Sequence, residues 1–147
     1  MTQEHFGVVA LLSSLLLAGP GSVLAAGDPA AAECSPGTLR GTYLFAFSGL
    51  TVSDGAPSPY AVAGYEVYDG AGRMRSVVTN NLSGKIESNV RQKDAYAVKS
   101  DCIGTVEYAD GTRYDLFIAP DGSRFVVVQT NPGKIAAGSS RGAPHSW

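Results

Sequence analysis

The sequence predicts an all-β domain, an eight-stranded antiparallel up-and-down barrel with one disulfide. Segments rich in aromatic and β-branched residues alternate with Asp-Gly turns, and the hairpin-like stretch 113–130 around Pro-Asp-Gly is the clearest case. The 147 residues include 18 glycines but only two methionines and one tryptophan, a balance that favours short strands over helices. Two cysteines, Cys34 and Cys102, complete the pattern and predict one bridge in an oxidising compartment.

The first 26 residues predict export. Residues 6–18 are a continuous apolar run, too short to span a bilayer comfortably, and small residues follow at 23–26, where a signal peptidase would cleave. We therefore expect a signal peptide over 1–26, a secreted or periplasmic location, and no stable membrane span in the mature form. The alternative, a buried helix of the mature domain, is disfavoured because a polar face is missing.

The first half of the domain alternates cleanly. Residues 39–50 place Tyr43, Phe45 and Phe47 on one face of a strand. Residues 51–59 contain turn residues and two prolines and are expected to form a loop. The next two strands are expected over 60–68 and 73–81, around the turn Asp-Gly-Ala-Gly at 69–72.

The second half contains shorter strands between tight turns. Turn residues at 101–102, 110–111, 120–122 and 131–133 separate four clear strands and a weaker last one, expected over residues 94–100, 103–109, 112–119, 123–130 and 134–141. The barrel domain therefore covers residues 39–141. Residues 142–147 are expected to be a flexible tail.

Residues 82–93 are ambiguous, because isolated apolar residues among polar ones fit either a short strand or a loop. The cysteines decide between the two. An additional strand would place Cys102 at the opposite end of the sheet from Cys34, beyond the roughly 7 Å that a disulfide allows between Cα atoms. A loop places both cysteines at one end and leaves eight strands, so that the last can pair with the first.

This arrangement predicts one plugged and one open end. Residues 27–38 form a leader that is expected to cross one end of the barrel, held there by Cys34. The connections 51–59 and 82–93 are expected to frame the other end as a mouth.

Charge alternation predicts which side chains face the interior. Near the mouth we expect five that could bind a ligand: Phe47, Tyr96, Tyr108, Tyr114 and Gln129. The alternative is that these side chains simply fill the barrel. A bulge at Gly104 would exchange Tyr108 and Glu107, and the facing of Glu66 relative to Tyr65 on the strand 60–68 is open in the same way. Either glutamate, if it points inward, is a candidate catalytic acid or base.

Several function classes find no support. The formal net charge of −2 gives no indication of nucleic-acid binding. His5 lies in the signal segment and His145 in the tail, so neither a Ser-His-Asp triad nor a usual zinc site is expected. The Asp-Gly pairs lack the spacing of a calcium loop. We therefore expect neither a metal nor another cofactor.

Cys34 and three motifs that follow it resemble a group of small exported bacterial proteins. These motifs are Leu-x-Gly-Thr-Tyr-x-Phe at 39–45, Tyr-x-Val-x-x-Asp-Cys-x-Gly-Thr at 96–105 and Gln-Thr-x-Pro-Gly at 129–133. That group is similar to calycin-like and allene oxide cyclase-like barrels, so the resemblance implies a barrel that binds a small apolar or amphipathic molecule. The first alternative to ligand binding as the function is an isomerase or cyclase of the allene oxide cyclase type. The second is a structural or self-association module, possible as a homo-oligomer, that uses the outer face around Val126 and Val128.

Overall fold

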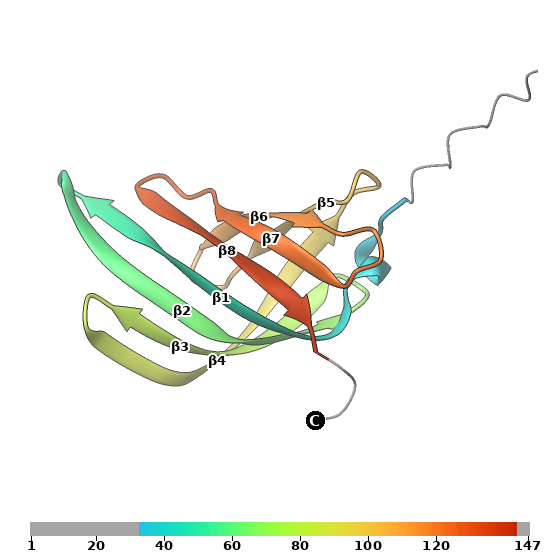
Figure 1. Cartoon of the computed structure of the whole chain (residues 1–147), viewed down its shortest axis with the longest axis horizontal. Coiled ribbons are helices and arrows are strands. Elements are labelled where there is room, and N and C mark those ends of the chain that lie inside the picture. Colours follow the sequence, from blue (N-terminus) through green and yellow to red (C-terminus); the bar gives the residue numbers. More distant parts are fainter. Residues whose placement is uncertain (1–32, 144–147) are drawn as a thin grey trace, which may run out of the picture. The chain divides into compact units, whose positions relative to one another are not determined.

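A computed structural model describes residues 33–143, which form a closed antiparallel barrel (Figure 1). Each strand pairs with the next along the chain, and β8 pairs with β1. This confirms the predicted fold class. The proposed signal peptide, residues 27–32 of the proposed leader and residues 144–147 of the proposed tail lie outside the described residues. The elements are η1 (Pro36–Thr38), β1 (Arg40–Ser53), β2 (Ala56–Asp69), β3 (Arg73–Leu82), β4 (Lys85–Val98), β5 (Ile103–Glu107), β6 (Arg113–Ile118), β7 (Arg124–Gln129) and β8 (Lys134–Gly142).

Residues 51–59 do not form the predicted loop. β1 continues to Ser53, a turn at Asp54 and Gly55 with φ of 51° and 77° follows, and β2 begins at Ala56. Two successive positive φ angles are typical of the tight turns that join antiparallel strands. Pro59 has no amide hydrogen to donate to a neighbouring strand. Its nitrogen lies on the same side of β2 as its carbonyl, which faces β3, and β3 pairs with β2 only from Tyr60 onward, so the missing donor is tolerated.

Residues 82–93 are also strand rather than loop, which corrects the second predicted connection. β3 ends at Leu82, Ser83 and Gly84 form a turn with φ of 53° and 92°, and Lys85 begins β4. Asn89, with φ of 58°, lies where the β3–β4 register shifts. The segment is the first half of the fourth strand and not an extra strand, so the count stays at eight.

The end of the barrel that contains the bridge is here called the disulfide end. Cys34 and Cys102 are bonded there, with their Cα atoms 4.9 Å apart. The Cys34 amide donates to the Ser100 carbonyl at 3.1 Å, and the Tyr43 hydroxyl donates to the Gly122 carbonyl at 2.6 Å. The bridge is typical of an oxidising compartment.

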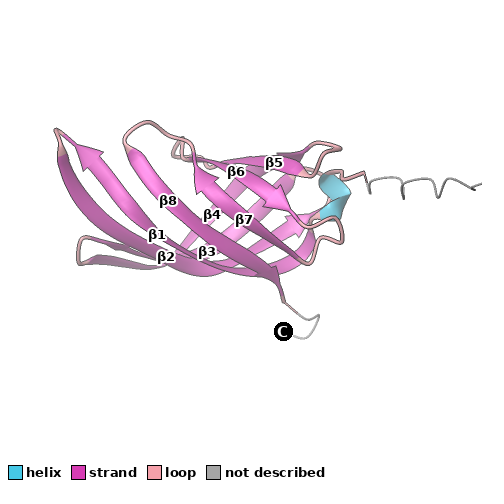
Figure 2. Cartoon of the chain, turned by 45° about the horizontal axis from the view of Figure 1, so that its top comes forward, coloured by secondary structure: helices cyan, strands magenta, loops and turns pink. Residues whose placement is uncertain are grey.

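The opposite end, called the open end, holds the turns at 54–55, 83–84, 108–112 and 130–133. β1, β2 and β4 have 14 residues each, whereas β5, β6 and β7 have five or six. As a result, the β1–β2 and β3–β4 hairpins extend past the shorter strands, as both views show (Figure 2). We call the projecting parts of these two hairpins the overhang.

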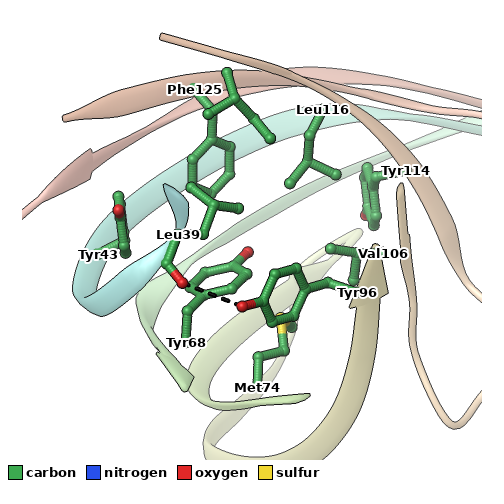
Figure 3. Packing of buried hydrophobic residues seen from close by; sticks show 10 residues of the cluster. Leu39, Tyr43, Tyr68, Met74, Tyr96, Val106, Tyr114, Leu116 and Phe125 are labelled. Carbon is green, nitrogen blue, oxygen red and sulfur yellow. Dashed lines mark hydrogen bonds between the residues drawn. The ribbon is translucent and has the colours of Figure 1, made fainter. Parts of the chain in front are cut away.

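The core lies toward the disulfide end. Strand alternation directs one side chain in two inward, and Figure 3 shows Leu39 and Tyr43 beside Tyr68, Tyr96 and Phe125. Tyr68 is only 2 % exposed, and its ring meets the ring of Tyr96 edge-on with centroids 4.9 Å apart. Within residues 33–143, there is no helix with the length and apolarity needed to cross a membrane.

Candidate functional site

Toward the open end, a layer of mainly aromatic side chains closes the barrel interior. The Tyr60 hydroxyl on β2 donates to Oε1 of Gln129 on β7, so this hydrogen bond crosses the barrel. The Phe47 ring lies beneath, with its centroid 6.4 Å from that of Tyr60 and 5.2 Å from that of Tyr114. These four side chains, Phe47, Tyr60, Tyr114 and Gln129, form what we call the floor.

The floor contains one residue that sequence reasoning missed. Tyr60 pairs with Gly49, two positions beyond Phe47 on β1, so its side chain points inward with that of Phe47. Recognising the turn at Asp54 and Gly55 would have fixed this register from the sequence. Burial raises the pKa of the Tyr60 hydroxyl, which therefore stays protonated at neutral pH and available as a donor.

Above the floor, the inner face of the overhang is half-buried and mostly uncharged. Thr51, Val62, Asn80 and Val90 contribute to it, one from each of the four long strands. Glu87, near the tip of the β3–β4 hairpin, carries a charge but forms a 3.1 Å ion pair with Lys85. On β8, Lys134 lies directly opposite Thr51 and donates from its Nζ to the Thr51 hydroxyl at 2.9 Å. A molecule resting on the floor would therefore contact apolar and neutral polar groups, with Lys134 and Glu87 toward the rim.

Below the floor, Glu66 is buried inside the barrel with 4 % of its surface exposed. Its Oε2 accepts a 2.8 Å hydrogen bond from the Tyr68 hydroxyl, and its Oε1 accepts a 2.6 Å hydrogen bond from the Tyr108 hydroxyl. Burial raises the pKa of the Glu66 carboxyl, and the hydrogen bonds from Tyr108 and Tyr68 offset this in part. Both carboxyl oxygens thus have protein partners.

The interior around Glu66 has no room for a ligand. Its cavity measures about 10 Å³, roughly the space of one water molecule. The cavity is lined by Phe45, Phe47, Glu66, Tyr68, Val106, Tyr108, Tyr114, Leu116, Phe125, Val127, Ser139 and Ser140. In this part of the barrel the side chains fill the space, which was the alternative to an open lumen.

The structure does not bring all five predicted binding residues together. Phe47, Tyr114 and Gln129 lie in the floor, and Tyr108 lies next to Tyr114, with ring centroids 5.8 Å apart. Tyr96 is at the other end of the barrel, which corrects its predicted place near the mouth. Its hydroxyl donates to the Pro36 carbonyl at 2.8 Å and to the Leu39 carbonyl at 3.1 Å, and Figure 3 shows the second of these contacts.

The structure also places the two candidate catalytic acids on opposite faces of the barrel wall. Glu107 lies on the outer face, where its Oε1 and the Arg113 Nη2 form a 3.0 Å ion pair. Glu66 lies inside, as described. Only Glu66 therefore has the surroundings that a buried acid or base requires.

Asp94 is a second buried acid that sequence reasoning missed. It is 9 % exposed, and its Oδ1 accepts a 3.0 Å hydrogen bond from the Ala109 amide. Burial raises the pKa of its carboxyl. Alternation from Tyr96 back along β4 would have placed Asp94 inward.

Metal-ligating groups are dispersed over the described part of the chain. Within residues 33–143, His, Cys, Asp and Glu side chains do not gather in groups of three or more that could hold a metal ion. The site is therefore built from aromatic rings, hydroxyls, amides and one buried carboxyl.

No family model and no curated protein matches the chain. Among solved structures, it is similar to a de novo designed fluorescence-activating β-barrel at 18 % identity and a TM-score of 0.45. That match covers 72 % of this chain and 94 % of the designed one.

Proposed function

We propose that this protein is exported and binds a small apolar or amphipathic molecule at the open end of its barrel. The observation that carries the proposal is the overhang above an aromatic floor, because it leaves a half-buried, mostly uncharged surface that the rest of the barrel does not cover. The disulfide and the signal-peptide pattern of residues 1–26 support export. The resemblance to calycin-like barrels agrees with this proposal and stays a prediction.

The floor suggests how such a molecule would be oriented. Its apolar part would pack on Phe47 and Val62, and a polar group would replace one partner of the Tyr60–Gln129 hydrogen bond. The Gln129 amide already has Asn131 as a second partner, with Nε2 and Oδ1 3.4 Å apart. One polar group of the ligand can therefore be bound without leaving the amide unsatisfied.

A charge on the inner face is the sharpest test. Val62→Glu should weaken binding of the neutral fluorescent probe N-phenyl-1-naphthylamine by about tenfold or more, because a carboxylate would have to be desolvated against the apolar probe. Ala63→Glu is the matched control, since Ala63 is the next residue of β2 and faces solvent on the outside. Fluorescence titration gives both affinities, and equal loss in the two variants would contradict binding at the open end.

The isomerase or cyclase alternative has weaker support. Glu66 has the raised pKa of a candidate proton carrier, but both of its oxygens accept tyrosine hydrogen bonds and the adjoining cavity holds about one water. A substrate would reach this carboxyl only after the floor had moved. Binding without turnover is therefore the function that the geometry supports best.

Self-association remains a second candidate because of the outer face of β7 and β8. Val126, Val128 and Ile135 are 51 %, 46 % and 62 % exposed, and Ala137 and Ser139 between them carry no charge. A second copy could pack on this apolar surface, which Arg124 and Arg141 border toward the disulfide end. If it does, Val126→Lys should shift a dimer to monomer in light scattering, whereas Thr105→Lys on the outside of β5 should not. A wild-type monomer at high concentration would remove this candidate.

A further inference from the structure

The net charge of −2 conceals a basic region on the outside of the barrel. Arg75 on β3 and Arg91 and Lys93 on β4 point outward, and we call these three residues the basic triad. None of them forms an ion pair, since the two ion pairs of the described residues join Lys85 to Glu87 and Arg113 to Glu107. No carboxylate of the described residues therefore lies within ion-pair distance of the triad, although Arg75 and Lys93 also line a second hollow together with Asp69, Asp94 and Glu107.

The strand register holds these charges close together. Arg75 lies directly opposite Lys93, and Val77 lies directly opposite Arg91. Side chains in such positions have Cβ atoms about 5 Å apart when directly opposite and about 7 Å apart on the diagonal. Like charges directly opposite each other destabilise a sheet, and an anion bound between Arg75 and Lys93 would relieve this repulsion.

A hollow lies over the triad. It has a volume of about 590 Å³ and is lined by Tyr65, Arg75, Ser76, Val77, Arg91, Gln92 and Lys93, without a carboxylate. Tyr65 pairs with Val77 across β2 and β3 and is 39 % exposed. The hollow thus combines three cations with an accessible aromatic ring at its edge.

We propose that this hollow binds an organic phosphate, in which a phosphoryl group is attached to a carbon skeleton. Two guanidinium groups supply planar pairs of N–H donors that match phosphate oxygens, and the lysine adds a compact positive charge. Tyr65 and Val77 give the attached carbon group a surface to pack on. The site lies on the outer face and is independent of the proposed ligand at the open end.

The chain provides a matched control. Arg124 and Arg141 form another directly opposed pair of cations, on β7 and β8, but Asp101 and Asp121 line the hollow beside them. The double variants Arg75→Gln with Lys93→Gln, and Arg124→Gln with Arg141→Gln, each remove two positive charges from exposed strands. General attraction of anions to the protein would fall equally in both.

Calorimetric titration with phenyl phosphate at constant ionic strength tests the site. We expect phenyl phosphate to bind the wild type. Its affinity should fall by about tenfold or more in the Arg75→Gln, Lys93→Gln double variant (the triad variant) and by less than about twofold in the Arg124→Gln, Arg141→Gln double variant (the control variant). Without ligand, the triad variant should be at least as heat-stable as the wild type at low salt, because repulsion between Arg75 and Lys93 is relieved. Equal losses in both variants, or retained binding in the triad variant, would overturn the proposal.

A sedimentation assay with phosphatidylcholine vesicles, with and without phosphatidic acid, separates two sources of the same group. Binding of phenyl phosphate that depends on the triad supports a soluble phosphate ester. Triad-dependent binding to phosphatidic acid vesicles alone supports a lipid headgroup. Absence of binding in both assays would refute the site.

Discussion

Replacing Cys34 and Cys102 together by serine is expected to lower the free energy of unfolding by about 4 kcal/mol, the largest stability effect that we predict. The bridge joins residues 68 positions apart, so in the unfolded chain it removes the entropy of a long loop. It also anchors η1, whose Pro36 carbonyl accepts a hydrogen bond from Tyr96. Urea unfolding of the double variant and the wild type measures the loss.

Two comparisons separate the covalent effect from the docking of the leader. The oxidised wild type in a reducing agent should approach the stability of the double variant. Tyr96→Phe should cost only about 1 kcal/mol, because it removes hydrogen bonds from the Tyr96 hydroxyl but leaves the bridge intact. Identical unfolding curves under oxidising and reducing conditions would contradict a stabilising bridge.

Glu66→Leu is expected to be the next most damaging change, with a loss of about 3 kcal/mol in the free energy of unfolding. The leucine would leave the hydroxyls of Tyr68 and Tyr108 without their acceptor in the interior. A combined variant with Tyr68→Phe and Tyr108→Phe should recover most of this loss, because no donor is then left unsatisfied. A triple variant as unstable as Glu66→Leu would show that cavity shape, and not hydrogen bonding, dominates here.

Glu66→Gln should instead reveal the ionisation of this carboxyl. The folded state raises its pKa, so its contribution to stability is fully present below the unfolded pKa, near 4.3, and is lost as pH rises through the folded value. The glutamine variant does not ionise, so its stability relative to the wild type should rise with pH. Asp94, which also raises the Glu66 pKa, is present in both proteins.

Urea unfolding between pH 4 and pH 8 measures this difference. Glu107→Gln is the matched control, because it makes the same chemical change on the outer face beside Arg113. The gap between Glu66→Gln and the wild type should widen with pH, whereas the control should show no such widening. A constant gap for Glu66→Gln would mean that the carboxyl is not desolvated.

Much of the fold could be predicted because its information is local. The turn at Pro120, Asp121 and Gly122, the alternation of Tyr114 with Leu116 and the pairing of the two cysteines can all be read along the chain, and the structure agrees. The overhang was missed, because its strands extend beyond the core. There the usual apolar alternation fades, and prolines at a free strand edge resemble a loop.

The sequence alone determined the β class, the eight-strand count, the bridge and most of the inward faces, because each follows from side-chain period, turn chemistry or cysteine number. Only the tertiary structure decided which inward residues meet. Tyr60 and Gln129 are 69 positions apart and Glu66 and Tyr108 are 42 apart. Such partners are fixed by strand register and by closure of the barrel, and a register slip of one residue would turn any of these side chains outward.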